Sequence, residues 1–375
     1  IVTRSFNAHT HQWVLFFSSG GKAFREKVWR LPEAAPAAKG RALVNLLPEL
    51  NSDTITTVLP LPQDEALWDS LHLVFATASG HVRRNRLSDF RNVRASGLIA
   101  MKLDEGDRLI GVATCREGDD ILLAARNGRC IRFQITEDSL RVFAGRDSSG
   151  VRGIRLAAGD EVVGLSVLRH VEVSTEERVA YLRATAARRR TAGEEDAPDA
   201  ASVEADEEAV GDVALDPERL AELESQEEFL LAVTTGGFGK RSSAYEYRTA
   251  GRGGQGIANV TLGKRNGGAV AATFPVRPGD DVMLVTDAGR LIRVPADQVR
   301  VTGRQAMGVT LFRVTAGEHV TSVFPVLDQG DGEDDLPPGD ETPDDGAPGN
   351  EAPGNRAEDG SGVADPNGTE NGSDG

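Results

Sequence analysis

The stretch LAVTTGGFGKR, Leu231–Arg241, consists of an apolar run, a turn that ends in glycine and a basic run, and it is one of five such copies. The other copies are FFSSGGKAFR (Phe16–Arg25), FATASGHVRR (Phe75–Arg84), LLAARNGRCIR (Leu122–Arg132) and MLVTDAGRLIR (Met283–Arg293). The turn glycines are Gly21, Gly80, Gly128, Gly237 and Gly289, and an arginine follows each one by four residues. Two short strand-like runs joined by a glycine turn are typical of a β-hairpin, so the pattern predicts five hairpins.

A second element follows each turn glycine after 17 to 22 residues. It opens at Gly40, Gly97, Gly150, Gly256 and Gly308, and the residues four and six positions later are apolar in every copy. Equal parity places these two positions on the same face of a strand. A polar turn and a further strand follow, most clearly in DEGDRLIGV, AAGDEVVGL and TAGEHVTSV. Each unit therefore has about 50 residues and four short strands, which predicts an all-β propeller with five visible blades.

The repeats are evenly spaced except for one long interval, and the pattern ends before the C-terminal segment. The step from Gly128 to Gly237 is too long, and the excess matches residues 169–228. We interpret this segment as an acidic, mostly flexible insertion whose last part, PERLAELESQEE, favours a short surface helix. Residues 328–375 are rich in Gly, Pro and acids, which predicts a disordered tail. The blades then occupy residues 1–168 (repeats one to three) and 229–327 (repeats four and five).

The net charge of −16 is unevenly distributed along the chain. By count, residues 328–375 carry 15 acidic and one basic side chain, and residues 169–228 carry 18 acidic and 7 basic side chains. The remaining residues, the repeat body, carry a net charge of +9. A basic body with two acidic appendages indicates a polyanion as its binding partner.

Other sequence signals exclude several classes of protein and site. No run of 18 apolar residues and no basic-then-apolar leader is present, so we expect no membrane association. The two cysteines, Cys115 and Cys130, do not make a disulfide framework, which favours the cytoplasm. His9 and His11 lack an evident third metal ligand, and the GRGGQG stretch has no strand-helix unit around it. We therefore expect no cofactor and no metal site.

The repeated pattern resembles the C-terminal domain of gyrase A and of topoisomerase IV. The resemblance is carried by FFSSGGKAFREKVWRLPEA, GRALVNLLPE, FATASGHVRRNRLSDF, SSGVRGIRL and TDAGRLIRV, and it spans residues 1–168 and 229–327. It implies a β-pinwheel, a propeller whose neighbouring blades exchange strands, with double-stranded DNA wrapped around its basic rim. Wrapping in that family directs negative supercoiling. The VNLLP and VRGIRL strings favour gyrase over topoisomerase IV, which stays an alternative.

Two departures from the family pattern are visible. The family domain usually has six blades, so the resemblance implies a sixth blade preceding Ile1. The glycine-rich gyrase-A box, needed for tight wrapping, is absent as a full motif, and Arg252–Gly256 (RGGQG) is a partial echo of it. The resemblance also implies that DNA cleavage belongs to an ATP-dependent type II topoisomerase, an A₂B₂ complex of gyrase A and gyrase B. The catalytic tyrosine of that enzyme would lie outside this chain, because Tyr181, Tyr245 and Tyr247 lack a catalytic context.

Basic side chains in and beside the hairpins are the candidate DNA contacts, one or two charges in each blade. For the arginines four residues after the turn glycines, a structural role inside each blade is an equal alternative, because their strand parity matches that of small apolar residues. A protein-interaction propeller without DNA binding is the alternative for the whole chain, although Trp68-Asp69 is its one WD dipeptide and falls outside the repeat register. The candidates are Lys22, Arg25, Lys27, Arg30, Arg41, Arg83, Arg84, Arg86, Arg129, Arg132, Lys240, Arg241, Arg252, Arg290 and Arg293.

Overall fold

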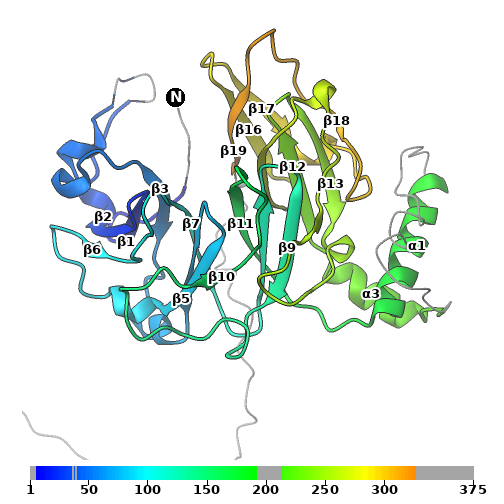
Figure 1. Cartoon of the computed structure of the whole chain (residues 1–375), viewed down its shortest axis with the longest axis horizontal. Helices are drawn as coiled ribbons and strands as arrows, with labels where there is room; N and C mark the ends of the chain where they lie inside the picture. Colours follow the sequence, from blue (N-terminus) through cyan, green and yellow to red (C-terminus); the bar gives the residue numbers. More distant parts are fainter. Residues whose placement is uncertain (1–5, 36–37, 39, 192–212, 327–375) are drawn as a thin grey trace, which may run out of the picture. The chain divides into compact units, whose positions relative to one another are not determined.

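The computed structural model describes residues 6–35, 38, 40–191 and 213–326, and it forms five antiparallel sheets, one for each repeat (Figure 1). The hairpins predicted from the glycine turns are the central strands of these sheets. They are β1 (Trp13–Ser18) with β2 (Lys22–Lys27), β4 (His72–Thr77) with β5 (His81–Arg86), β8 (Asp120–Ala125) with β9 (Arg129–Gln134), β12 (Phe229–Thr234) with β13 (Phe238–Ser243), and β16 (Asp281–Thr286) with β17 (Leu291–Pro295).

A third strand pairs with the first strand of each hairpin and comes from the end of the same repeat. These strands are β3 (Ile55–Pro60), β7 (Leu109–Cys115), β11 (Val162–Leu168), β15 (Val270–Val276) and β19 (Val320–Val326). Strand β3 lies against β7, β7 against β11, β11 against β15 and β15 against β19. The sheets are therefore joined along this side, and the opposite side of each sheet is its outer edge.

The fourth strand of four sheets comes from the following repeat, so the strand exchange that the resemblance implied is confirmed. These two-residue strands are β6 (Leu98–Ile99) on β2, β10 (Val151–Arg152) on β5, β14 (Ile257–Ala258) on β9 and β18 (Val309–Thr310) on β13. Each directly follows one of the second-element glycines. Among the described residues the fifth sheet has three strands, β17, β16 and β19.

In the four sheets that receive an exchanged strand, the turn glycine of the hairpin leaves room for that segment. Gly237 has φ +76°, and a Cβ built there would lie 2.2 Å from the Phe312 carbonyl oxygen. Its own carbonyl accepts hydrogen bonds from the backbone N–H groups of Leu311 and Phe312, at 2.9 and 3.1 Å. A side chain would block this approach, so glycine is required here for space as well as for its positive φ.

The hydrophobic core lies between neighbouring sheets. Phe17 from the first sheet, Phe75 from the second and Phe90 from the following turn are fully buried, and Phe17 contacts both rings edge-on with centroids 5.6 and 6.0 Å apart. Of the apolar residues predicted to share one face, the first of each pair is buried in the second to fifth repeats (Met101, Ile154, Val260 and Phe312), and the second of each pair is half-buried. In the first repeat Val44 is 46% exposed, so the period-two pattern predicted the core side correctly in four repeats and wrongly at Val44.

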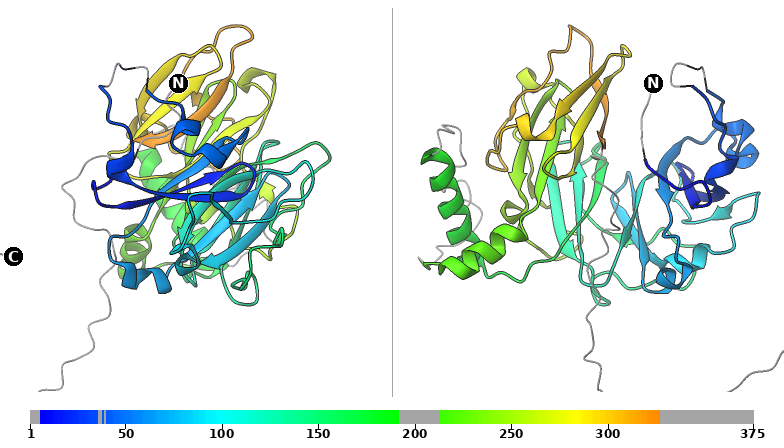
Figure 2. Two further views of the ribbon diagram at one scale, coloured as in Figure 1. Left: turned by 90° about the vertical axis from the view of Figure 1, so that its left-hand side faces the viewer. Right: turned by 180° about the vertical axis from the view of Figure 1, so that it is seen from behind.

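Two helices belong to the segment interpreted as an acidic insertion. They are α1 (Thr175–Thr191) and α3 (Pro217–Ser225), which are joined by the Arg188–Glu224 ion pair at 2.9 Å and lie together in the right-hand view of Figure 2. Helix α3 matches the predicted PERLAELESQEE helix. Helix α1 was not predicted, and it packs through Tyr181 against Tyr245 of the fourth repeat, with ring centroids 5.0 Å apart. Residues 192–212 and the predicted tail lie outside the described residues.

No helix in the described part of the chain is both long and apolar enough to cross a membrane. Within that same part, no cluster of three or more His, Cys, Asp or Glu side chains has the arrangement of a metal site.

Candidate nucleic-acid interface

Four of the candidate basic residues are buried: Arg83, Arg84, Arg132 and Lys240. Arg84 has no exposed surface and forms ion pairs with Glu117 and, at 3.0 Å, with Glu137. Arg132 donates to Asp120 Oδ2 at 2.7 Å and to the Ala244 carbonyl at 2.8 Å.

Arg83 and Lys240 are turned towards backbone carbonyls. Arg83 donates to the Ser148 carbonyl at 2.8 Å, and burial lowers its pKa to about 10. Lys240 donates to Ser242 Oγ at 3.0 Å and to the Gly303 carbonyl at 3.1 Å, and burial lowers its pKa to about 7. A phosphate on the surface cannot reach these four side chains where they lie, so we assign them to blade stability.

The arginines four residues after the turn glycines mostly bond within their own repeat or to the following segment. Besides Arg84 and Arg132, Arg25 lies over the Trp13 ring at 4.1 Å and donates to the Arg91 carbonyl, and Arg241 donates to the Val299 carbonyl at 2.8 Å. Arg293 is the most exposed, with 64% of its side chain accessible, although it pairs with Asp281. The geometry therefore favours the structural alternative for this series, most clearly at Arg84 and Arg132.

The remaining candidates reach the surface. Arg41 and Arg86 are exposed and form no side-chain hydrogen bond or ion pair with any residue that the structure describes. Arg30 pairs with Glu26 at 3.4 Å, and Arg290 pairs with Glu318 at 3.0 Å. The other accessible candidates are exposed Arg129 and half-buried Lys22, Lys27 and Arg252.

Sequence reasoning missed a series of outward bases on the exchanged segments. Five residues after the second-element glycines, the chain has Asn45, Lys102, Arg155, Thr261 and Arg313, and all five are exposed. The signal was present, because positions four and six are the inward ones and position five has the opposite parity. Three of these five residues are basic. Because the exchanged strands form the outer edges, Lys102, Arg155 and Arg313 lie along the outer edges of the first, second and fourth sheets, and Thr261 has the equivalent place on the third.

The loops that carry these bases contact one another from repeat to repeat. The Lys102 N–H donates to the Arg146 carbonyl at 3.2 Å, the Arg155 N–H to the Gly254 carbonyl at 2.8 Å, and the Thr261 N–H to the Gln305 carbonyl at 3.3 Å. These backbone bonds hold neighbouring bases in a fixed relation, so a ligand can meet several of them without first ordering the loops.

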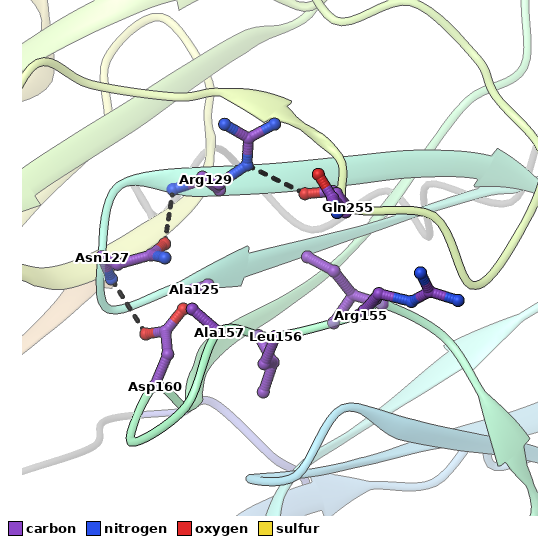
Figure 3. A pocket seen from close by; sticks show the side chains of 9 residues that line it. Ala125, Asn127, Arg129, Arg155, Leu156, Ala157, Asp160 and Gln255 are labelled. Atoms are coloured by element: carbon purple, nitrogen blue, oxygen red, sulfur yellow. Dashed lines mark hydrogen bonds between the residues drawn. The ribbon is translucent and has the colours of Figure 1, made fainter.

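The loop Arg252–Gly256, the partial echo of the gyrase-A box, connects two repeats. Arg252 donates to the carbonyls of Ser139 and Arg152, at 2.5 and 2.6 Å. Arg129 donates to the Gln255 and Gly256 carbonyls, at 2.9 and 2.6 Å, and Figure 3 shows the first of these bonds. A pocket of about 220 Å³ lies beside the loop, and the Arg155 guanidinium points away from it in Figure 3. The Arg252 guanidinium therefore holds this loop against the neighbouring repeat instead of extending into solvent.

The three tyrosines are all buried. Burial raises the pKa of each phenol, to about 12 for Tyr245 and further for Tyr181 and Tyr247. The Tyr181 hydroxyl donates to Glu227 at 3.0 Å and the Tyr247 hydroxyl to Asn259 at 2.9 Å. Tyr247 therefore packs inside a blade, and Tyr181 and Tyr245 pack where α1 meets the fourth repeat.

Comparisons with known proteins agree with the repeat structure. The family model described as "DNA gyrase C-terminal domain, beta-propeller" matches residues 12–62, 71–116, 119–169, 228–277 and 280–327, one match for each repeat. The gyrase A protein of Granulibacter bethesdensis is 77% identical over 347 residues, which is 90% of this chain and 37% of that protein. The gyrase A protein of Rickettsia bellii is 42% identical over 335 residues, 89% of this chain and 36% of that protein.

Two solved structures share the fold. The C-terminal domain of DNA topoisomerase IV has a TM-score of 0.61 at 18% identity and covers 84% of this chain and 80% of its own. The DNA gyrase A C-terminal domain has a TM-score of 0.59 at 20% identity and covers 85% and 84%. The chain spans little more than a third of the length of the curated relatives it matches. The five repeat-by-repeat matches show that this chain belongs to the family of β-propeller C-terminal domains of DNA gyrase.

Proposed function

We propose that this chain binds double-stranded DNA along the outer edges of its sheets and wraps it, as the non-catalytic module of a gyrase A protein. The observation that carries the proposal is the outward position of Lys102, Arg155 and Arg313 at equivalent places on three of the four exchanged segments. The exposed candidates Arg30, Arg41, Arg86, Arg129 and Arg290 add positive charge to the surface of the repeats.

The free energy needed to bend DNA favours basic residues spread over several blades above a single basic cluster. Bending about 40 base pairs through a half turn costs roughly 10 kcal/mol elastically. One non-specific patch with a dissociation constant of about 10⁻⁴ to 10⁻⁶ M supplies roughly 5.5–8 kcal/mol. A single blade therefore cannot hold a bent duplex, whereas bases repeated over several blades can.

The compartment and the complex that we propose for this chain are taken from its gyrase A relatives. We propose that the chain works in the cytoplasm as part of gyrase A, which assembles with gyrase B as an A₂B₂ complex. That complex would supply the ATP-dependent breakage and rejoining of DNA and introduce negative supercoils. The chain itself would bind DNA without metal or nucleotide, so EDTA should leave its affinity unchanged.

The test compares two triple variants that each lose three positive charges. Lys102→Gln, Arg155→Gln and Arg313→Gln remove the outer-edge bases. The control is Arg108→Gln, Arg126→Gln and Arg277→Gln, which removes bases at the ends of β7, β8 and β15, away from the exchanged strands. Mobility shifts over a range of salt should show that the first triple reduces the slope of log K against log [salt] by about 2.7, because each lost phosphate contact removes about 0.9. The control triple should keep the wild-type slope.

Closed circular DNA relaxed by a topoisomerase in the presence of the chain tests wrapping separately. Wild-type protein should change the linking number, and the outer-edge triple should do so less. A protein-interaction propeller would give neither a mobility shift nor a linking-number change, and equal slopes for the two triples would reject the outer-edge track.

A further inference from the structure

The polar turn of the fourth repeat is longer than its counterparts in the second, third and fifth repeats. Each of these turns joins an exchanged segment to the last strand of its repeat. The ends of the turn are six residues apart in residues 103–109, 156–162 and 314–320, and eight residues apart in residues 262–270. We call residues 263–268 (GKRNGG) of the fourth repeat the basic turn.

The basic turn also has the opposite charge to its counterparts. In each of the three shorter turns, acidic side chains outnumber lysine and arginine. In the second repeat, Asp107 Oδ1 accepts a hydrogen bond at 3.0 Å from the backbone N–H of Ser79 in the hairpin turn. In the fourth repeat, the equivalent N–H of Gly236 donates to the Asn266 carbonyl at 3.1 Å. A neutral carbonyl therefore does here what a carboxylate does in the second repeat.

The charged residues of the basic turn are Lys264 and Arg265, and both extend from an ordered backbone. Both are exposed, and neither forms a side-chain hydrogen bond or ion pair with a residue that the structure describes. The Asn266 side chain is fully buried, accepts from the Gly263 N–H and donates to the Thr261 carbonyl, each at 2.9 Å. A ligand can therefore meet the two bases without first ordering the turn.

The basic turn connects the outer edge of the third sheet to the hairpin turn of the fourth. At one end, β14 pairs with β9, and the Asn259 N–H donates to the Gly128 carbonyl at 2.7 Å. At the other end, the Asn266 carbonyl accepts from Gly236. The two bases therefore lie between these two contacts, at the hairpin-turn ends of the third and fourth sheets.

The outer edge of the third sheet has no base at the position that is basic on the other three exchanged segments. Thr261 occupies that position, and its hydroxyl donates to the Gln305 carbonyl at 2.6 Å. Lys264 and Arg265 follow three and four residues later, and residues 247–279 contain no acidic residue. A duplex that follows the outer edge therefore meets its next positive charge at the basic turn, where no carboxylate of this stretch opposes it.

We propose that Lys264 and Arg265 bind the phosphate backbone of the duplex as it passes the third and fourth sheets, and draw it from the outer edge towards the hairpin-turn ends. This inference rests on the proposed function and gives the DNA path a direction. Displacement towards one end of the sheets makes the wrapped path non-planar, and a non-planar path has writhe. The basic turn therefore contributes to the linking-number change as well as to affinity.

The first test is the double variant Lys264→Gln with Arg265→Gln. Mobility shifts over a range of salt should show that the slope of log K against log [salt] falls by about 1.8, because each lost phosphate contact removes about 0.9. The linking-number change in relaxed circles should fall as well. The matched control is Arg108→Gln with Arg126→Gln, since both side chains lie at hairpin-turn ends but pair with Glu161, at 2.7 and 2.5 Å. The control should keep the wild-type slope.

Tethered cleavage separates a direct contact from a long-range effect of charge. Iron-EDTA attached to Lys264→Cys should cut an end-labelled duplex, and the same group attached to Arg108→Cys should not. The natural cysteines, Cys115 and Cys130, are buried, which directs attachment to the new thiol. Thermal unfolding checks that each variant keeps the fold.

An unchanged slope for the Lys264→Gln and Arg265→Gln pair, or no cleavage from position 264, overturns the inference. The proposed function stands in that case if the outer-edge triple still lowers the slope. A wild-type chain that gives no mobility shift overturns both.

Discussion

Two arginines that are close together on one strand have different roles, one structural and one as a candidate ligand contact. On β5, Arg84 is fully buried between Glu117 and Glu137, whereas Arg86, two residues later, is exposed and has no side-chain partner among the described residues. Burial, more than charge, decides which of the two can meet a ligand. A basic run in the sequence therefore contains both a structural cation and a candidate contact.

Arg84→Ala should lower the free energy of unfolding by about 2–4 kcal/mol, because it empties a fully buried, packed site and removes both ion pairs of the buried guanidinium. Arg86→Ala should change stability by less than about 0.5 kcal/mol but reduce the salt slope of DNA binding by about 0.9. Urea unfolding and fluorescence anisotropy at several salt concentrations measure the two effects. Equal stability losses would show that Arg86 is structural too.

Lys240 should make stability depend on pH. Burial lowers its pKa to about 7, so between pH 7 and the usual lysine range the unfolded chain holds a proton that the folded chain lacks. Stability from this group therefore rises with pH across that window and is constant below it. The stability of wild type relative to Lys240→Met should increase by about 1 kcal/mol per pH unit from roughly pH 7.5 to 9.5. Urea unfolding at each pH gives the difference, and a pH-independent difference would contradict the assignment.

At the level of single elements, strand exchange is what joins one repeat to the next. Each exchanged strand has two residues, too few to be stable alone, and its position depends on the turn glycine that it covers. Gly237 and Gly289 are equivalent turn residues with similar φ values of +76° and +79°. At Gly237 the Phe312 carbonyl lies 2.2 Å from a built Cβ, and at Gly289 nothing lies within 4 Å.

These two glycines form a matched pair of variants. Gly289→Ala should cost about 1 kcal/mol, since it bears the penalty of a positive φ alone, whereas Gly237→Ala should cost about 3 kcal/mol because it also displaces the exchanged segment. Thermal or urea unfolding measures both. Hydrogen exchange at the Leu311 and Phe312 amides should accelerate in Gly237→Ala and stay unchanged in Gly289→Ala; similar costs at the two sites would mean that the exchanged strand adds little stability.

Over the full length of the chain, charge separates the repeat body from the acidic appendages. The body carries +9 and residues 328–375 carry −14. These opposite charges motivate the hypothesis that the tail competes with DNA for the outer edges as an intramolecular polyanion. The alternative is that the tail only keeps the chain soluble, as a net charge far from zero does.

Deleting residues 329–375 distinguishes these two roles. Competition predicts a higher DNA affinity for the shortened chain at low salt, with the difference shrinking as screening increases above about 0.15 M salt. Fluorescence anisotropy with one duplex at several salt concentrations measures it. Identical affinities at low salt would leave the tail with a solubility role.

Local sequence signals were enough to predict the repeated elements, because a glycine turn and a period-two pattern act over a few residues. The five hairpins, the inward faces of Met101 and Ile154 and the α3 helix followed from such signals. Which basic side chains are buried, which sheet each exchanged strand joins, and the packing of α1 against Tyr245 emerged only from the folded chain. Those outcomes depend on contacts between residues that are far apart in the sequence. Arg84 bonds to Glu137, 53 residues later, and Arg178 bonds to Tyr245, 67 residues later. A pattern that spans a few residues contains no information about the free energy of such contacts.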